Sequence, residues 1–231
     1  MNPLRFAFKA LFPLLVLMLP ACQNLQNGRS QSAIYKAYHD YNVPVHRPNN
    51  PENVRVYISL ESQTAYVMEG ERALLVMPVT VGRPGFSTPT GSFRIGEKSA
   101  KRRAVSHGFF RYGDQYVEGW TRDHGGRQMV GTPMPYWCGM AERPEIGMHT
   151  EWVYPEPHSH GCIRMHVNVA PRFFAIVHSG TPVNIARTQP YDKTLGASLK
   201  RPPSPAILGE YSIQERMTDA FFTRHKPVVF E

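Results

Sequence analysis

Cysteine is scarce in this sequence, because only Cys22, Cys138 and Cys162 occur among its 231 residues. It has no Cys-x-x-Cys pair, which argues against the common zinc-binding patterns. It also lacks a long Lys or Arg run and any nucleic-acid-binding motif, so the net charge of +8 indicates general basicity suited to an anionic surface. No internal repeat is present, which excludes a repeat architecture.

Long hydrophobic runs are missing as well. The apolar run over residues 10–19 follows Arg5 and Lys9 and is too short for a good membrane-spanning helix, so it predicts a secretory signal peptide over residues 1–21. Leu-Pro-Ala-Cys at positions 19–22 resembles a bacterial lipobox, which implies that Cys22 becomes a lipidated N-terminus. Gln23 is not the aspartate that favours inner-membrane retention, so we expect outer-membrane attachment facing the periplasm. The alternative is a plain signal peptide with an incidental cysteine.

The rest of the chain divides into three parts. Residues 22–52 are polar without an apolar period and predict a flexible tether, apart from a possible short helix over residues 33–41. Residues 53–187 predict one folded domain. The tail over residues 188–231 is rich in proline, and Ser212 with Glu215 forms a capping box that predicts a short helix.

The folded domain is predicted to be mostly β. The 21 prolines and 18 glycines favour loops and strands over long helices. Apolar alternation predicts strands over residues 54–60, 64–69, 73–81, 145–149 and 181–186. Residues 169–178, with Asn168 as the N-cap, predict a helix. Residues 98–127 are irregular and charged, and we expect them to form loops that cover an active site.

The candidate catalytic residues cluster around Cys162, which has His149 upstream and His160 and Arg164 close by in the sequence. The thiolate is the reactive form of cysteine, and a thiol with a pKa of about 8.5 is mostly protonated at neutral pH. A nearby imidazole can take that proton and stabilise the thiolate as an ion pair. Arg164 adds a positive charge suited to the thiolate or to a substrate carboxylate. The pattern predicts a cysteine nucleophile.

Two motifs carry a family resemblance. Ser-His-Gly-Cys-Ile-Arg-Met at 159–165, with His149 upstream and Thr-Pro-Thr-Gly at 88–91, resembles the signature of L,D-transpeptidase catalytic domains of the YkuD type, which remodel bacterial peptidoglycan. The resemblance implies a mostly-β sandwich or barrel-like domain with one or two short helices. It also implies no metal or organic cofactor, peptidoglycan stem peptides as substrates, and acylation by carbapenem-type β-lactams.

The resemblance also assigns roles. It implies that Cys162 is the nucleophile, that His149 is the base, and that His160 orients the site. Two further candidates, Ser159 and Gly161, lie in the segment 159–162, called the cysteine loop below. The candidates for substrate binding are Arg164, Tyr136 and Trp137. Ser159 is expected to bond either His149 or the loop backbone. Backbone N–H groups near Gly161 and Cys162 are candidates for an oxyanion hole.

Alternatives remain at this point. The thioester would pass to an amine, giving a wall cross-link or an attached lipoprotein, or to water, giving an L,D-carboxypeptidase or endopeptidase. A catalytically silent wall-binding lipoprotein would also suit the basic charge. A metal site is a third possibility, with ligands drawn from His149, His158, His160, Cys162 and His166. We expect Cys138 to be a small buried side chain, and a regulatory Cys138–Cys162 disulfide is the alternative.

Overall fold

The computed structural model describes residues 19–125, 127 and 129–231, with side chains from Ser30 onward. Most of the predicted signal peptide therefore lies outside the described residues, and so does the side chain of Cys22. Within the described part of the chain, no helix combines the length and the apolar character that crossing a membrane requires.

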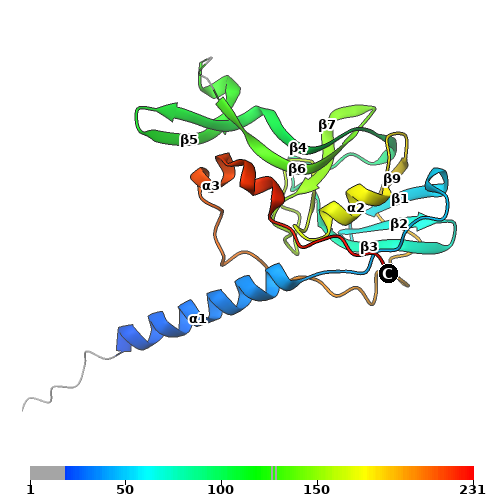
Figure 1. Ribbon diagram of the computed structural model, residues 1–231, viewed down its shortest axis with the longest axis horizontal. Coiled ribbons are helices and arrows are strands. Elements are labelled where there is room, and N and C mark those ends of the chain that lie inside the picture. Colours follow the sequence, from blue (N-terminus) through cyan, green and yellow to red (C-terminus); the bar gives the residue numbers. More distant parts are fainter. Residues whose placement is uncertain (1–18, 126, 128) are drawn as a thin grey trace, which may run out of the picture.

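One large sheet dominates the fold (Figure 1). Its strands are β1 (Val54–Ser59), β2 (Thr64–Glu69), β3 (Arg72–Thr80), β4 (Gly91–Tyr112), β5 (Gln115–Trp120), β6 (Met129–Met140), β7 (Arg143–Thr150), β8 (Ile163–Met165) and β9 (Pro182–Ala186). The helices are α1 (Leu19–Asp40), α2 (Ala170–Ile176) and α3 (Ile213–Met217), with 3-10 turns η1 (Pro51–Asn53), η2 (Thr121–Asp123) and η3 (Asp219–Thr223).

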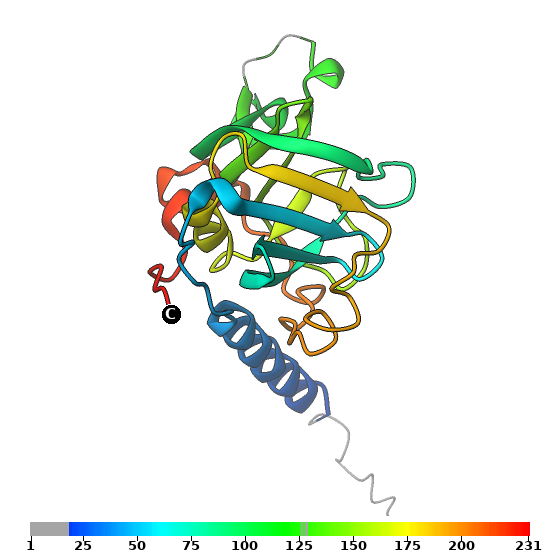
Figure 2. The same cartoon turned by 90° about the vertical axis from the view of Figure 1, so that its right-hand side faces the viewer.

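The long strand β4 closes the sheet. The strand order is β5-β4-β6-β7-β8-β3-β2-β1-β9, and the first residues of β4 also pair with β9, as in Gly91 opposite Ile185. Further along, β4 pairs with β6, with Arg102 opposite Met134. One strand thus joins both ends of the sheet into a barrel-like body, which Figure 2 shows from the side of β9 and β1. The mostly-β, barrel-like prediction is confirmed.

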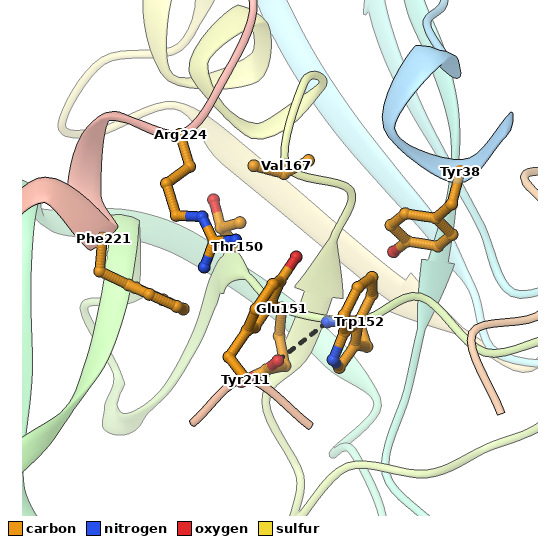
Figure 3. Close-up of a pocket in the computed structure, with 8 residues that line it drawn as sticks. All are labelled: Tyr38, Thr150, Glu151, Trp152, Val167, Tyr211, Phe221 and Arg224. Atoms are coloured by element: carbon orange, nitrogen blue, oxygen red, sulfur yellow. Dashed lines mark hydrogen bonds between the residues drawn. The ribbon is translucent and has the colours of Figure 1, made fainter. Parts of the chain in front are cut away.

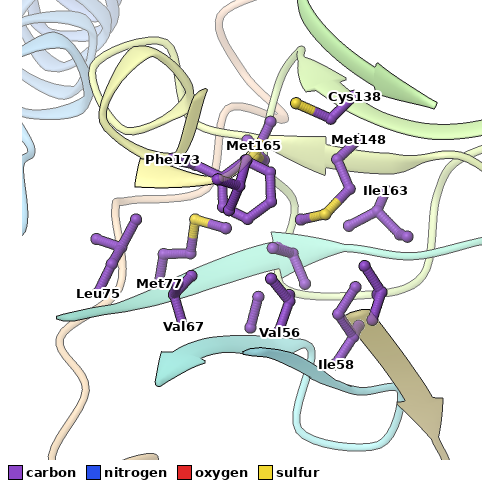
Figure 4. Packing of buried hydrophobic residues seen from close by; sticks show 14 of the residues in the cluster. Val56, Ile58, Val67, Leu75, Met77, Cys138, Met148, Ile163, Met165 and Phe173 are labelled. Carbon is purple, nitrogen blue, oxygen red and sulfur yellow. The ribbon is translucent and has the colours of Figure 1, made fainter. Parts of the chain in front are cut away.

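The interior of this body is apolar. Alternate residues of β1–β3 point inward, including Val56, Ile58 and Met77, and they meet Met148 from β7 and Phe173 from α2 (Figure 4). This alternation of inward and outward side chains is the reason that these strands could be predicted from the sequence. Full burial of each large side chain contributes about 1.5–3 kcal/mol.

Residues 98–127 are not the loops that we expected. β4 continues to Tyr112 and returns as β5, so residues 107–120 form a projecting hairpin, called the arm below (Figure 1). The register of β4 against β6 shifts between Ile95 and Lys98 and again between Arg103 and Gly108. Such irregularities break the two-residue period on which strand prediction depends.

The leader also differs from the expected flexible tether. α1 runs to Asp40, and Tyr38 in its last turn is 1% exposed, with its hydroxyl accepting the N–H of Val153. The amide of Asn168 donates to the carbonyls of His39 and Tyr41. Residues 38–45 are therefore fixed to the domain, whereas the start of α1 points away from it (Figure 1). Asn168 does not cap α2, whose N-cap is Val169.

The tail contains the predicted helix. In α3, Ser212 accepts the N–H of Glu215, and the Glu215 carboxylate accepts the N–H of Ser212, so the capping box is confirmed. Arg103 of β4 donates to the carbonyls of Arg216 and Met217. These contacts seat the tail under the base of the arm (Figure 1).

Candidate active site

The fold brings Cys162 and His149 to neighbouring strands. β7 and β8 are parallel, with His149 opposite Arg164 and Met148 opposite Ile163. Met148 and Ile163 face the core. Side chains alternate along strands, so His149 and Arg164 face the other side, and Cys162, two residues before Arg164, reaches the same side at the entry to β8.

His149 is buried and held in one tautomer. Its side chain is 8% exposed, and its Nδ1–H donates to the carbonyl of Thr150 at 3.0 Å. A carbonyl can only accept, so Nδ1 carries the proton and Nε2 is left as the basic nitrogen. Burial lowers the pKa of His149 to about 4, although the nearby carboxylate of Glu151 acts in the opposite direction. The imidazole is therefore neutral at neutral pH.

Cys162 is half-buried, with its Sγ 3.7 Å from the carbonyl oxygen of Glu145. Burial raises the pKa of the thiol, and the backbone N–H of Gly147 and the guanidinium of Arg164 partly offset this effect. The resting pair is thus a neutral thiol and a neutral imidazole. This differs from the ion pair that the sequence suggested, because burial disfavours both charged forms.

Trp137 lies at the site and Tyr136 does not. The Trp137 indole covers Gly147, where an added Cβ would lie 2.5 Å from the ring, so a side chain there has no room. The ring centroids of Trp137 and His149 are 6.1 Å apart. Tyr136, with φ of 56°, instead turns toward α2 and the tail: its ring packs on Phe174 and its hydroxyl bonds His225 at 2.5 Å. Tyr136 thus contacts α2 and the tail, and its expected role in substrate binding stays a prediction.

The cysteine loop is held by two hydroxyl groups. Ser159 donates to the carbonyl of Cys162 at 2.5 Å and accepts the N–H of Gly161 at 3.1 Å, so it bonds the loop backbone rather than His149. Thr88 donates to the carbonyl of Gly161 and accepts the N–H of Gly82, both at 2.9 Å. Gly161 has a φ of 111°, which favours glycine. In the sequence, Thr88 stands out only as the first residue of the Thr-Pro-Thr-Gly motif.

His160 lies on the outer side of this loop. Its Nε2 accepts a hydrogen bond from Arg83 at 2.9 Å, and its ring meets the edges of Phe86 and of Trp120 on the arm. Burial and the neighbouring Arg83 lower the pKa of His160. These contacts give His160 a role in joining the loop to the arm.

Two guanidinium groups flank the thiol. Arg164 is half-buried and lies beside His149 in the strand register. Arg102 of β4 lies over Trp137, with its Cζ 4.8 Å from the ring centroid, and pairs with Glu97. Both cations favour the anionic form of Cys162. Sequence reasoning missed Arg102, because its place beside the site depends on long-range strand pairing.

The histidines do not assemble into a metal site. In the described part of the chain, no group of three or more His, Cys, Asp or Glu side chains is arranged to hold an ion. His166 is buried and its Nε2 bonds the carbonyl of Tyr38, while His158 stacks on Tyr154.

Cys138 lies on the core side of the sheet, away from the thiol of Cys162. Both cysteines are free thiols, so the alternative of a disulfide between them does not hold in this structure. Burial raises the pKa of the Cys138 thiol to about 12. Cys138 is therefore the small buried side chain that the sequence predicted.

Comparison with known proteins gives one family match. Residues 53–185 match the family described as the L,D-transpeptidase catalytic domain, YkuD. A comparison with curated proteins gives no match. Among solved structures, an L,D-transpeptidase from Mycobacterium smegmatis is 19% identical, with 58% of each chain covered and a TM-score of 0.45. One from Stackebrandtia nassauensis is 18% identical, with 68% of this chain and 66% of that chain covered and a TM-score of 0.44.

Mycobacterium tuberculosis L,D-transpeptidase 1 is 20% identical, with 58% of this chain and 61% of that chain covered and a TM-score of 0.42. The chain thus spans 58 to 66% of the length of these three structures. Fold and site together define a mostly-β domain with a buried histidine on β7 and a cysteine just before the adjacent parallel strand β8. Since the family match spans more than half of the 231 residues, the chain belongs to the L,D-transpeptidase catalytic domain family.

Proposed function

We propose that this protein is a peptidoglycan L,D-transpeptidase in which Cys162 is the nucleophile and His149 is the general base. One observation carries the proposal: His149 in β7 faces the side of the sheet that Cys162 reaches just before β8, and the Thr150 carbonyl holds Nδ1 of His149, which leaves Nε2 basic. The substrate class, stem peptides, comes from the family.

In the first step, Cys162 Sγ attacks the carbonyl carbon that joins the third stem residue to the following D-alanine. Nε2 of His149 takes the thiol proton as the S–C bond forms. When the tetrahedral intermediate collapses, the C–N bond breaks, the imidazolium returns the proton to the amine, and D-alanine leaves. The Glu151 carboxylate stabilises the transient imidazolium, which burial alone disfavours.

The developing oxyanion needs backbone donors. Ser159 already accepts the N–H of Gly161, so this group is engaged in the free enzyme. The N–H of Cys162 is the better candidate, and one such donor is typically worth about 3 kcal/mol. Arg164 would hold a substrate carboxylate, and Trp137 would form a wall of the site.

In the second step, an acceptor attacks the thioester and releases Cys162. A stem-peptide amine would give a cross-link, and a lipoprotein lysine would give an attached lipoprotein. We infer an amine acceptor, with water giving the hydrolytic alternative. The signal sequence and Cys22 support a lipid-anchored protein on the periplasmic face of the envelope, at the outer membrane.

Intact-protein mass spectrometry with a stem tetrapeptide tests the first step. We expect a thioester on the wild-type chain with release of D-alanine, and none on Cys162→Ser. His149→Gln should slow acylation by roughly 10²–10⁴-fold, the range for a lost general base. Cys138→Ser is the matched control and should acylate normally. Release of D-alanine by Cys162→Ser at the wild-type rate would refute the mechanism.

The acceptor requires a cellular experiment. Cells with and without the protein would differ in cross-linked muropeptides if the acceptor is a stem amine. They would differ in wall-bound lipoprotein if it is a lysine. A change only in shortened stems would favour hydrolysis over transfer.

A further inference from the structure

Tyr38, in the last turn of α1, lies where the strands β7 and β8 end. The last paired residues of these parallel strands are Thr150 and Met165. Just beyond them, the Tyr38 ring contacts Trp152, which follows β7, with ring centroids 4.8 Å apart (Figure 3). It also contacts His166, which follows β8, with centroids 4.5 Å apart. A side chain of the leader thus joins the two strands around which the candidate site is built.

Hydrogen bonds to both strand ends fix this contact. The Tyr38 hydroxyl accepts the N–H of Val153 at 2.8 Å. From the other strand end, Nε2 of His166 donates to the backbone carbonyl of Tyr38 at 2.8 Å, and its Nδ1 accepts the N–H of Asn168 at 3.1 Å. Both bonds of this imidazole require the same tautomer, because a carbonyl only accepts and an N–H only donates.

Solvent does not replace these partners. Tyr38 is 1% exposed, and both Val153 and His166 are buried. A buried N–H that loses its partner is costly, so the backbone of Val153 depends on the Tyr38 hydroxyl. Because Tyr38 is buried, its side chain is out of reach of a substrate, and any effect on catalysis must pass through the two strands.

The strand end that the leader holds also orients His149. The Nδ1–H of His149 donates to the carbonyl of Thr150, three residues before Val153. Between them, the N–H of Glu151 donates to the carbonyl of Met165 at 3.1 Å and ties the end of β7 to β8. A shift of the backbone at Val153 would therefore move the carbonyl that sets the tautomer of His149.

We propose that Tyr38 is a positioning residue for the His149–Cys162 pair, and that the leader end, residues 38–41, belongs to the catalytic unit. The family match begins at residue 53, so this contact lies outside the segment that the family defines. The reaction that Tyr38 supports rests on the proposed function, whereas its effect on the orientation of His149 does not.

Single-turnover acylation of the full chain by a stem tetrapeptide separates positioning from folding. Misplaced groups lower the rate constant, whereas loss of folded protein lowers the fraction that becomes acylated. Tyr38→Phe keeps the ring and removes the hydroxyl, and we expect the rate constant at saturating peptide to fall by at least about fivefold. Tyr38→Ala removes both and should lower it by up to about 10²-fold, the scale of a 1 Å displacement. The peptide concentration at half-saturation should stay unchanged, because Tyr38 does not touch the substrate.

Tyr66→Phe is the matched control. Tyr66 is also fully buried, and its hydroxyl donates at 2.8 Å to Asp192, which follows β9. This variant loses a buried hydroxyl that does not bond the end of β7 or β8, so it should acylate at the wild-type rate constant. Unchanged rate constants in both Tyr38 variants, a loss confined to the acylated fraction, or an equal slowing by Tyr66→Phe overturns the proposal.

The Nδ1–H signal of His149 in NMR spectra gives a readout that needs no reaction. The chain has ten histidines, and His149→Gln assigns the signal. We expect Tyr38→Ala to shift it or to give a mixture of tautomers, and Tyr66→Phe to leave it in place. A His149 signal that is identical in the wild type and Tyr38→Ala overturns the positioning role. If the wild-type chain is not acylated, the proposed function fails, and the His149 signal still decides the role of Tyr38.

Discussion

Arg216 of α3 and Glu118 of the arm form a two-point ion pair, with guanidinium nitrogens 2.7 and 2.8 Å from the carboxylate oxygens. The Arg216 side chain is only 8% exposed and also donates to Glu210. Trp120, two residues beyond Glu118 at the base of the arm, meets His160, so the tail supports the strands that border the cysteine loop. The pair therefore connects a tail of unassigned role to the site.

Arg216→Met should destabilise the protein by about 2 kcal/mol. Removing one partner of a fully buried pair costs about 3–5 kcal/mol, and Glu118 remains partly hydrated, which reduces the effect. For a chain of this length, that corresponds to a fall in Tm of roughly 4–8 °C. Arg187→Met is the matched control: its pair with Glu61 is exposed, so the loss should stay below about 1 kcal/mol. Equal falls in stability for the two variants would show that the buried pair contributes no more stability than the exposed one.

Thr88→Val should disturb the cysteine loop without changing side-chain volume. The variant leaves the N–H of Gly82 and the carbonyl of Gly161 without the partner that the hydroxyl provides. Each unsatisfied buried group costs about 1–3 kcal/mol, so we expect lower stability and slower acylation of Cys162. Thr88→Ser keeps the hydroxyl and should stay near wild type in both measurements. A Thr88→Val protein that acylates at the wild-type rate would leave Thr88 as a turn residue only.

The parts of this fold that could be predicted are those with a local signal. β1, β2 and the capping box of α3 depend on alternation or on spacing within a few residues, and the structure has them close to where they were expected. The core positions of β7 follow from the same alternation, whereas β8 has only three residues and was not among the predicted strands.

The remaining features depend on contacts between distant segments. Nothing near Tyr38 in the sequence reveals that its hydroxyl bonds the backbone of Val153. Tyr136 and Trp137 were treated alike, although a positive φ at Tyr136 separates their environments. Arg102 reaches the site only because β4 pairs with β6 in an interrupted register. These relationships exist only in the folded chain.

Acid should destabilise the native state through two buried imidazoles. Burial lowers the pKa of His149 to about 4 and that of His166 to about 3. The unfolded value is about 6.5, so as the pH falls below it the unfolded chain binds protons that the folded chain excludes. Stability should therefore fall from about pH 6.5 toward pH 4, with each imidazole contributing up to about 1.4 kcal/mol per pH unit.

Urea unfolding at several pH values measures this slope. His166→Asn should remove the contribution of one imidazole and flatten the curve by up to about 1.4 kcal/mol per pH unit. His149→Asn should flatten it similarly. A wild-type curve that is level between pH 6.5 and pH 4, or variants with an unchanged slope, would contradict the assigned burial effect.

Cys22→Ala should release the protein from membranes. The lipobox-like sequence places this cysteine where lipidation would occur, and a protein with a signal peptide but no acyl acceptor would remain soluble in the periplasm. Fractionation of cells into membrane and soluble parts measures the change. Cys138→Ser is the control and should stay membrane-bound. If Cys22→Ala also stays with the membrane, another element holds the protein there.

Gly147 and Trp137 should behave as a coupled pair. An added Cβ at Gly147 would lie 2.5–2.7 Å from three atoms of the indole, and Trp137 is 2% exposed and has little room to move. Gly147→Ala should therefore cost about 1–3 kcal/mol, as overpacking does, and should slow acylation of Cys162 because the displaced ring lies beside His149. Trp137→Phe alone should also destabilise by leaving a void.

The double variant distinguishes this clash from a general intolerance of change at β7. Phenylalanine lacks the indole atoms that the new methyl group would meet, so Gly147→Ala with Trp137→Phe should be more stable than the sum of the single effects predicts, by about 1 kcal/mol or more. Denaturant unfolding of the four proteins gives this coupling energy, and acylation rates show whether the thiol recovers with the packing. Strictly additive losses would mean that Gly147 is required for another reason, such as the N–H that it directs at Cys162.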